Sequence, residues 1–546
     1  MFSRYKNILK SEFQGYNSQR FSKDIMAGLT AAAVALPLAL AFGVSSGADA
    51  ASGLITAVIA GIVISLLSGA SYQISGPTGA MAAVLIPIVS KYTLQGVFVV
   101  SIMAGVILLL ASLLKLGKFV SVIPRPVITG FTSGIALIIA LGQIDHFFGT
   151  ASTGETVIQK LLSYGRLGFP VAWQPVLVGA IVVGIMLLWP KKLGALVPSS
   201  LVGIVAATLI SSLFQLPVST IGAIPSTLLP DVRFDMAALQ LSNLPSFISP
   251  AVSIAALGMV ESLLCGTSAL RMKPNGTFDA DQELFAQGIG NILIPFFGGI
   301  PATAAIARTS VAIKSGSQTR LTGIVHALML LASMFLLGGI MARIPYAALA
   351  GVLMVTAWRM NEWPAIRHMF AKRNRGAILK YLITLAATVT FDLTIAIIIG
   401  LIVSAFVFVV ISSRLEVASS RVKNELLHNC PQNVEQEHAG TTVIYMTGPL
   451  FFGNAEKLFE QVRADIKSSE KIIFSMRGVS AIDSTGAEVM LDVVKQCVSE
   501  QVCVIICGLR REVRNRLDIA GVTELIGEDA YYFSVDRALT ANMLEA

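Results

Sequence analysis

The chain has 546 residues, of which 54% are hydrophobic and only 13% are charged. Soluble domains carry about 25% charged residues, and a soluble core would not bury this much apolar surface, so the composition excludes an ordinary soluble protein and predicts an integral membrane protein. The net charge of +8 is compatible with nucleic-acid binding, but the placement of the basic residues argues against that class. Residues 1–23 are polar and basic, and we expect no cleaved signal peptide.

Apolar segments follow one another from about residue 24 to residue 413. Because a helix needs about 20 apolar residues to cross a bilayer, hydropathy predicts an all-α membrane domain over 24–413, preceded by a cytosolic segment at 1–23. We expect fourteen spans, several of them short, beginning near residues 24, 52, 76, 94, 125, 174, 197, 247, 280, 301, 319, 345, 376 and 393.

Lysine and arginine are distributed unevenly between alternate loops of this arrangement. With the N-terminus inside, the inside segments hold about 20 of these residues and the outside segments about 5, which is a positive-inside bias. The bias predicts a multi-pass protein of the cytoplasmic (inner) membrane with both termini in the cytosol. It also accounts for much of the net charge without any nucleic acid.

A weak internal repeat links the two halves of the apolar region. Seven predicted spans separate the copies, so the second half is expected to be inverted relative to the first, as in many secondary transporters. The sequence thus predicts a seven-plus-seven inverted repeat over about 24–215 and about 247–413; the alternative is chance similarity between Leu- and Ala-rich segments. The matched positions, all 221 residues apart, are LLAS at 109–112 and 330–333, Gly117 and Gly338, Ile123-Pro124 and Ile344-Pro345, and Gly130 and Gly351.

From Arg414 onward charged and polar residues become frequent. TTVIYM (441–446), KIIFSM (471–476) and VCVIIC (502–507) are typical of short buried strands, and amphipathic helical stretches lie near 453–468, 484–500 and 509–520. This alternation predicts a small cytosolic α/β domain at 439–546, joined to the membrane domain by a linker at 414–438.

Two segments combine Gly and Pro at corresponding places in the two halves. SYQIS (71–75) is expected to be extended, and GPTGAM (76–81) then opens a helix with Pro77 in its first turn. GGIPATAAIA (298–307) opens a second helix with Pro301 in its first turn. Paired interruptions of this kind mark transporter sites, and two helix N-termini would suit an anion. The alternative is a re-entrant turn without a ligand.

Two charged residues lie within predicted spans. Arg308, two turns after Pro301, could add positive potential to an anion site, or could pair with a carboxylate or with backbone carbonyls. Glu261 lies in ALGMVESLLCG, where a charged carboxylate is costly, so it is suited to taking up a coupling proton. It could instead help to coordinate sodium, or be a structural partner of Arg308 or of helix ends. We rank Asp392 lower and expect His146 and His326 to be packing or interfacial residues.

In the soluble part, Asp483 and Ser484 lie between a predicted strand and a helix. Either residue is first of all a helix N-cap, although an exposed Ser484 hydroxyl could also accept phosphate. There is no Walker A motif, nucleophile elbow or HExxH sequence. The five cysteines (Cys265, Cys430, Cys497, Cys503 and Cys507) lack the spacing of a zinc site. We therefore predict no metal, no cofactor and no enzymatic activity.

Several motifs together resemble the sulfate permease (SulP) family of anion transporters. They are ALPLALAFGVSSG (35–47), ISGPTGAM (74–81), IPRPVITGFTSGIAL (123–137), GMVESLL (258–264) and GGIPATAAIARTSV (298–311). GPLFFGNAEKL (448–458) and IDSTGAE (482–488) resemble the family's C-terminal STAS domain. The resemblance covers nearly the whole chain. Nucleobase transporters share the seven-plus-seven plan but usually lack a STAS domain.

The resemblance implies a core domain of spans 1–4 and 8–11 that moves against a gate domain of spans 5–7 and 12–14, with the anion between the starts of spans 3 and 10. Glu261 matches the family's acidic position. Sodium-using bicarbonate transporters have Asp there and Thr one turn on, where this chain has Glu261 and Cys265, a departure that favours protons. Ser484 matches a serine that is phosphorylated in stand-alone STAS relatives. The implied anion-binding residues are Phe42, Pro77, Thr78, Gly79, Thr303, Ala304, Ala305 and Arg308.

We therefore expect secondary active transport of a small anion by proton-coupled symport with elevator-like alternating access. Sulfate is the default substrate, with bicarbonate or a dicarboxylate as alternatives. Sodium-dependent bicarbonate symport, an uncoupled anion channel or exchanger, and a membrane-anchored sensor remain open. The expected partners are the anion, a coupling proton or sodium ion, the lipid bilayer, a second copy of the chain in a homodimer and a cytosolic protein bound by the STAS domain, but no nucleic acid.

Overall fold

A computed structural model describes residues 2–118, 124–154, 156–190, 197–225, 227–236, 244–274, 276–391, 393–412, 415–422 and 440–541. The chain divides into two compact units, Met1–Ile402 and Val403–Ala546. Asp392, Cys430 and most of the expected linker at 414–438 lie outside the described residues.

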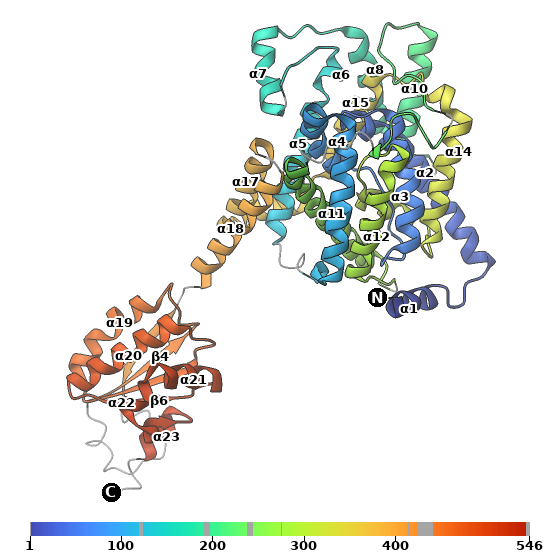
Figure 1. Cartoon of the computed structure of the whole chain (residues 1–546). Coiled ribbons are helices and arrows are strands. Elements are labelled where there is room, and N and C mark those ends of the chain that lie inside the picture. The colour runs from blue at the N-terminus through green and yellow to red at the C-terminus, as the bar shows by residue number, and fades with distance from the viewer. Residues whose placement is uncertain are drawn as a thin grey trace. The chain divides into compact units, whose positions relative to one another are not determined.

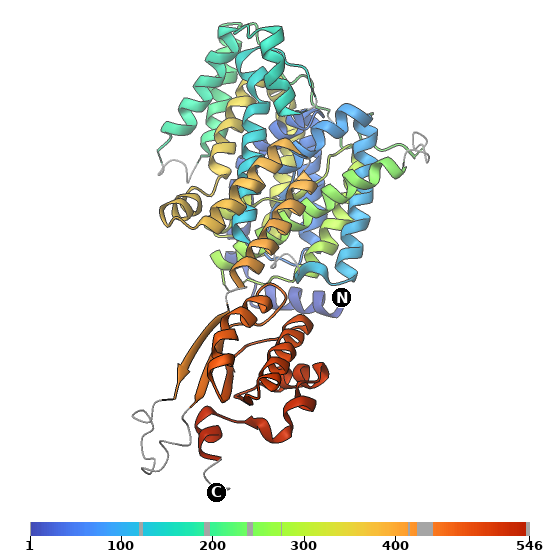
Figure 2. The same ribbon diagram turned by 90° about the vertical axis from the view of Figure 1, so that its left-hand side faces the viewer.

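The first unit is helical, and its helices run broadly alongside one another (Figures 1 and 2). In the first half they are α2 (Ser18–Ser45), α3 (Ala50–Leu67), α4 (Gly79–Leu113), α5 (Arg125–Gly142), α8 (Trp173–Leu188) and α10 (Ser199–Leu213). In the second half they are α11 (Leu244–Met272), α12 (Ala280–Leu293), α13 (Ile306–Lys314), α14 (Leu321–Met341), α15 (Tyr346–Met360) and α17 (Arg375–Thr390), followed by α18 (Leu393–Ser412), within which the boundary between the two units falls. Shorter elements are α1 (Phe2–Glu12), α6 (Ile144–Phe148), α7 (Val157–Leu167), η4 (Ile294–Phe297) and α16 (Trp363–Ala371).

Each predicted span has a helix near it, and α4 covers two of them. Thr93 has φ 60° and ψ −176°, which breaks α4 into two arms close to the expected span start at residue 94. The number of helices that cross the bilayer stays a prediction, because several are shorter than a full crossing requires. Among the described residues, six helical segments are long and apolar enough to cross alone: Ser18–Ser45, Ala50–Leu67, Gly79–Leu113, Arg125–Phe148, Leu244–Met272 and Leu321–Met341.

The helices of the first unit pack in two groups. In one group α4 packs against α11 and α12, while α14 packs against α2 and α3. In the other, α5 packs against α15 and α17, while α8 packs against α10 and α15. Small residues allow close crossings: a Cβ atom added at Gly53 of α3 would lie 2.0 Å from the Ala39 carbonyl oxygen of α2. This crossing fixes the helix that carries Phe42.

The N-terminal segment, expected only to be polar, forms the helix α1 and is anchored by a buried ion pair. Arg320 at the start of α14 lies with its Nη2 2.8 Å from Glu12 Oε2, and the two side chains are 3% and 2% exposed. Arg320 Nη1 also donates to the Leu66 carbonyl oxygen at the end of α3, at 3.0 Å. One guanidinium therefore ties α1 to the ends of two helices of the bundle.

Replacing Glu12 by glutamine is expected to lower the free energy of unfolding by about 3–5 kcal/mol, because the Arg320 charge would stay buried without its counter-ion. Thermal unfolding of the purified chain in detergent measures the loss. The control is Asp492→Asn, which removes the partner of Lys495 in a pair whose side chains are 63% and 57% exposed. That change is expected to cost less than about 1 kcal/mol. Equal effects of the two variants would contradict a structural role for the buried pair.

Asp24 is a second anchor that the sequence did not reveal. It is fully buried, and its carboxylate accepts hydrogen bonds from the Gln318 and Thr319 backbone amides at 2.6 and 3.0 Å. The Thr319 and Thr322 hydroxyls donate to it as well, at 2.6 and 2.8 Å. Asp24 of α2 thus satisfies the otherwise unpaired donors before and in the first turn of α14, as a capping residue would.

The second unit contains a five-stranded sheet in the order β3–β4–β5–β6–β7, parallel except for the pairing of β3 with β4. The three expected strands and the helices between and after them are confirmed. Strand β3 lies within the range 414–438 that we expected to be a linker. Its exposed, polar sequence EVASSR lacks the pattern of a buried strand. The elements are β3 (Glu416–Arg421), β4 (Thr441–Thr447), α19 (Ala455–Ser468), β5 (Lys471–Gly478), α20 (Ser484–Ser499), β6 (Cys503–Cys507), α21 (Arg511–Ala520), α22 (Val522–Ile526), η7 (Glu528–Ala530), β7 (Tyr531–Tyr532) and α23 (Val535–Ala541).

Candidate functional site

Two short, buried strands from the two halves of the first unit pair with each other. Strand β1 (Ser75–Gly76) runs antiparallel to β2 (Thr303–Ala304), with Ser75 opposite Ala304 and Gly76 opposite Thr303. The Ala305 amide extends the pairing by donating to the Ile74 carbonyl oxygen at 3.0 Å. Helix α4 begins three residues after β1, and α13 begins two residues after β2. The N-termini of the two helices are therefore held next to each other.

Both prolines precede their helices, so the prediction that they occupy first turns is wrong. Helix α4 begins at Gly79, because the Thr78 hydroxyl accepts the Met81 amide at 3.3 Å and makes Thr78 the N-cap. Helix α13 begins at Ile306, because pairing with β1 keeps the chain extended through Ala304. Pro77 and Pro301 lie in the extended segments, which proline also tolerates.

Glu261 of α11 joins the two helix starts. Its Oε2 accepts the Thr78 hydroxyl at 2.9 Å and the Thr303 hydroxyl at 2.6 Å, and these two hydroxyl oxygens are 3.3 Å apart. Thr303 is fully buried and Thr78 is 7% exposed. One carboxyl oxygen thus contacts a side chain from each half of the chain, at the point where the two halves meet.

Arg308 of α13 is buried beside this cluster. Its Nη2 donates to the Pro77 carbonyl oxygen at 2.5 Å, and its side chain packs so closely on Gly76 that a Cβ there would lie 2.4 Å from Nη1. Nη1 itself is buried without a hydrogen-bond partner among the described residues. Of the two partners considered for Arg308, the structure therefore shows the backbone carbonyl. Among the described residues, no ion pair joins Arg308 to Glu261.

The remaining predicted membrane residues surround the same two helix starts. The Phe42 ring of α2 lies against the first residue of α4, since a Cβ added at Gly79 would be 3.0 Å from Phe42 Cε1. The Ala304 amide donates to the Ser262 hydroxyl at 3.3 Å, which fixes β2 to α11. The structure thus brings every predicted anion-binding residue and Glu261 into one neighbourhood.

Polar side chains that the sequence-based prediction missed hold the extended segments from behind. Asn291 of α12 both donates to the Ala302 carbonyl, at 3.0 Å, and accepts the Ala302 amide, at 2.8 Å. The Thr56 hydroxyl accepts the Ile300 amide at 2.7 Å, and the Thr309 hydroxyl accepts the Ile74 amide at 3.0 Å. Irregular backbone at membrane depth requires such partners. The signal that could have found Asn291 is the run of polar side chains on α12, which lies within the predicted membrane domain.

Cys265 lies one turn after Glu261, at the position where the resemblance would place a threonine in a sodium-using relative. Its thiol donates to the Thr309 hydroxyl at 3.3 Å. Because Thr309 in turn supports the Ile74 amide, Cys265 is bonded to the framework of the strand pair.

In the second unit, Asp483 rather than Ser484 caps helix α20. Asp483 Oδ1 accepts the Gly486 amide at 2.7 Å, and Oδ2 accepts the Phe452 amide at 3.1 Å. Ser484 is the first helical residue and is exposed, and no hydrogen bond of the described residues involves its hydroxyl. The capping interpretation is therefore wrong for Ser484 and right for Asp483.

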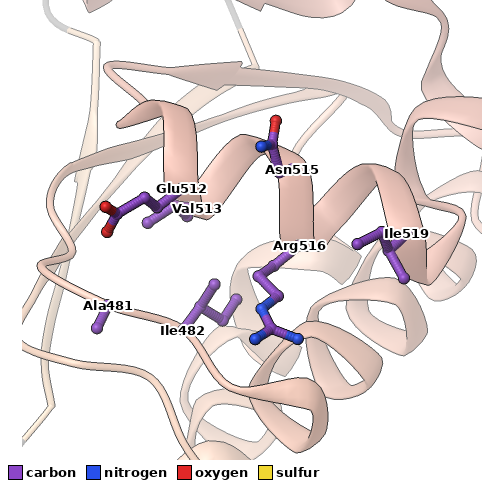
Figure 3. Close-up of a pocket in the computed structure, with 7 residues that line it drawn as sticks. All are labelled: Ala481, Ile482, Glu512, Val513, Asn515, Arg516 and Ile519. Carbon is purple, nitrogen blue, oxygen red and sulfur yellow. The ribbon is translucent and has the colours of Figure 1, made fainter.

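A pocket of about 440 Å³ adjoins the segment that leads to Ser484. Figure 3 shows it between Ala481 and Ile482 on one side and helix α21 on the other, with Arg516 extending toward the Ile482 segment. The lining includes both Glu512 and Arg516. Because one of these side chains is acidic and the other basic, the lining favours neither an anionic nor a cationic ligand.

Replacing Asp483 by alanine is expected to destabilise the first turn of α20 by about 1–2 kcal/mol, since two backbone amides lose their acceptor. Ser484→Ala is the matched control and is expected to change stability by less than about 0.5 kcal/mol. Hydrogen exchange of the peptide containing Gly486, in the full-length chain, measures both. Faster exchange in the Ser484 variant than in the Asp483 variant would contradict the capping assignment.

Comparison with known proteins gives the family. Residues 21–384 match the family described as the Sulfate permease family, and residues 433–538 match the STAS domain. The chain belongs to the sulfate permease family. It is therefore an integral, multi-pass membrane transporter with a C-terminal STAS domain, and not an enzyme, as the sequence resemblance implied.

Relatives match almost the whole length of this family member. YvdB of Bacillus subtilis, named as a sulfate transporter, is 34% identical over 95% of this chain and 97% of that protein. The bicarbonate transporter BicA of Picosynechococcus sp. is 29% identical over 94% of each chain.

Solved structures agree with the fold of both units. The transmembrane domain of a cyanobacterial bicarbonate transporter, BicA, has a TM-score of 0.63 at 32% identity and covers 71% of this chain and 98% of that one. The structure of the murine anion transporter Slc26a9 in the inward-facing state has a TM-score of 0.82 at 17% identity, over 96% of this chain and 91% of that one. At that identity the second likeness shows the fold alone.

Proposed function

We propose that this protein transports a small anion by secondary active transport, and that the anion binds where the helices α4 and α13 begin. The observation that carries the proposal is the β1–β2 pairing, which aligns two helix N-termini beside the buried Arg308 guanidinium. Free backbone amides and the positive end of the dipole at a helix N-terminus attract anions. Arg308 adds a full positive charge, and its Nη1 has no partner among the described residues. The anion-binding residues are those predicted from the sequence, from Phe42 to Arg308.

Sulfate is the first candidate substrate, because the family and the relative YvdB carry its name. Bicarbonate is the second candidate, because BicA is related over nearly the whole chain. A dicarboxylate is the third, since backbone amides bind carboxylates as readily as sulfate.

We assign Glu261 as the coupling residue, and the coupling ion that it binds is a proton. Its carboxyl oxygen contacts Thr78 and Thr303, so a change in its protonation alters hydrogen bonds at both helix starts. A sodium site needs several oxygen ligands. Cys265, one turn away, supplies a sulfur atom in place of an oxygen ligand, and its thiol donates a hydrogen bond to Thr309. This arrangement favours a proton over sodium.

The transport movement we propose is elevator-like. The group of α2, α3, α4, α11, α12, α13 and α14 carries the anion site and acts as the core, while α5, α8, α10, α15 and α17 form the gate. The sequence resemblance adds α18, the last predicted span, to the gate. The antiparallel pairing of β1 with β2 supports a seven-plus-seven inverted repeat, which is part of this proposal, since two inverted halves would produce such a pairing.

Several proposals concern the protein's surroundings. We place it in the cytoplasmic membrane with both termini in the cytosol, as the basic residues predict. It acts as a homodimer, and its STAS domain binds a cytosolic protein. Ser484, exposed at the first position of α20, is a site for regulatory phosphorylation, since a phosphate is favoured at a helix N-terminus.

Uptake by liposomes that contain the purified chain tests the function. Labelled sulfate, bicarbonate and fumarate are offered separately, each under an inward proton gradient, an inward sodium gradient or no gradient. We expect one of these anions to accumulate faster with protons and no faster with sodium. Stimulation by sodium alone would favour sodium-dependent bicarbonate symport, and equal rates under all three conditions would favour a channel or exchanger.

Arg308→Gln is expected to raise the KM for the transported anion roughly tenfold to a hundredfold, because a charge-assisted hydrogen bond is worth about 1.5–3 kcal/mol. Glutamine retains a donor for the Pro77 carbonyl, so the fold should persist. Arg271→Gln is the control, because Arg271 is exposed at the end of α11. Uptake kinetics in liposomes measure both variants, and an unchanged KM for Arg308→Gln would remove Arg308 from the anion site.

A further inference from the structure

A second carboxyl lies buried in the core, away from Glu261. Glu283 of α12 is fully buried, and its Oε2 accepts the Ser68 hydroxyl at 2.5 Å and the Gly69 amide at 3.2 Å. Its Oε1 accepts the Gln287 Nε2 at 2.9 Å. All three contacts come from neutral donors, and no ion pair of the described residues involves Glu283. A fully buried carboxylate without a paired cation is costly, so Glu283 is a candidate for a functional role.

Gln287 connects this carboxyl to the strand at the anion site. The same Nε2 that donates to Glu283 also donates to the Ser75 hydroxyl of β1, at 3.0 Å. Gln287 and Ser75 are 0% and 1% exposed. The other end of the Gln287 amide, Oε1, is buried without a partner among the described residues. One amide thus bridges a buried carboxyl and β1, and half of its hydrogen-bonding capacity is unused.

The bridge has two hydrogen-bonding arrangements. With Glu283 ionised, Gln287 must present Nε2 as donor, and Oε1 is left unsatisfied, as observed. When Glu283 takes up a proton, its hydroxyl needs an acceptor, and a half-turn of the amide places Oε1 where Nε2 was. Oε1 then accepts both the Glu283 proton and the Ser75 hydroxyl proton, and Nε2 becomes the unsatisfied group. Each state therefore leaves one end of the Gln287 amide unpaired, the oxygen in one and the nitrogen in the other.

We propose that Glu283 is a second proton-binding site, whose state Gln287 relays to strand β1 by reversing the hydrogen bond to Ser75. The only change is uptake or loss of one proton by the carboxyl, with the proton supplied by water. The proposal rests on the proposed function in one respect, namely that β1 belongs to the anion site. Since only Pro77 separates β1 from the Thr78 cap, a reversal at Ser75 acts on the anion-binding backbone.

Few other charges act on Glu283. Helix α3 has no titratable residue, η4 has none, and α4 has only Lys91 and Tyr92, beside the break at Thr93. From α11, Cys265 interacts electrostatically with Glu283, and from the start of α14 so does Arg320, whose guanidinium is already paired with Glu12. On and before its own helix, the acidic residues are Asp281 and the capping residue Asp279.

The thiol of a Ser75→Cys variant can report the reversal without any substrate, because the infrared S–H stretch falls to lower frequency when the thiol becomes a donor. We compare the full-length variant in lipid nanodiscs at acid and at alkaline pH, subtracting the parent chain to remove its own thiols. The S–H band is expected to lie lower at acid pH. The shift should be lost when Glu283→Gln or Gln287→Met is added, and kept when Glu261→Gln is added.

The outcomes separate this proposal from the proposed function. An S–H band that does not move with pH overturns the relay, as does a shift that persists in the Glu283→Gln or Gln287→Met background. A shift that disappears with Glu261→Gln would assign the proton to Glu261 and also overturn it. If a double variant fails to fold, the single Ser75→Cys chain still decides whether a pH-dependent reversal exists. If anion uptake does not respond to a proton gradient, the proposed coupling is wrong, but the S–H result is unaffected.

Discussion

Glutamine in place of Glu261 is expected to abolish the acceleration of anion uptake by an inward proton gradient. Glutamine has the size of a protonated glutamate, and its amide oxygen can still accept from Thr78 and Thr303. It cannot release a proton, so the site stays in one of its two hydrogen-bonding states throughout the transport cycle. Uptake with the gradient should fall to the rate measured without it. The measurement is labelled-anion uptake by liposomes at fixed internal pH.

The control for this variant is Glu362→Gln. Glu362 also accepts a threonine hydroxyl, from Thr129 at 3.1 Å, but it is exposed and lies far along the chain from the strand pair. Uptake by the control should respond to protons as the parent does. A Glu261 variant that keeps its full response to protons, with unchanged thermal unfolding, would show that Glu261 does not couple transport to protons.

Gly53→Ala is expected to lower the free energy of unfolding strongly. Its new methyl group would lie 2.0 Å from the Ala39 carbonyl oxygen and 2.8 Å from both the Cα and the N of Gly43, all of them backbone atoms. A side chain can rotate away from a clash, but these atoms move only if α2 and α3 separate. The expected loss is about 3 kcal/mol or more, at the upper end of what overpacking costs. The fraction of folded protein after solubilisation and its thermal unfolding temperature measure it.

Gly184→Ala provides a matched control, because Gly184 also lies within a helix, α8, and no atom would lie within 4 Å of its new Cβ. Alanine is the better helix former by about 0.8–1 kcal/mol, so this variant should be as stable as the parent or slightly more so. If Gly53→Ala were as stable as Gly184→Ala, the close crossing of α2 and α3 would not exist.

The sequence predicted best what depends on local pattern. Apolar runs located the helices, and short runs such as KIIFSM located the central strands of the STAS domain, because burial leaves a periodic signal. Strand β3 was missed because an exposed edge strand lacks that signal. The break at Thr93 was placed correctly by hydropathy, although nothing in the residue itself predicts its positive φ.

The candidate site also combines features that local sequence pattern predicts with features that depend on contacts between distant segments. Gly and Pro indicated where two helices begin, but their first residues were misplaced, because pairing between β1 and β2 joins segments far apart in sequence. Glu283 escaped notice for a related reason. It follows Asp279 and Asp281 near a helix start, where acidic residues are commonplace, and only the fold reveals that Ser68 and Gly69 bury it.

The pairing of β1 with β2 also has a consequence for biosynthesis. Gly76 and its partner Thr303 are 227 residues apart. At a synthesis rate of about 5–20 residues per second, β1 waits roughly 11–45 s for its partner strand. During that time its backbone donors and acceptors have no partner strand, and hydrocarbon cannot satisfy them. We therefore expect the first half of a nascent chain to stay beside the insertion machinery, with its polar centre shielded, until the second half emerges.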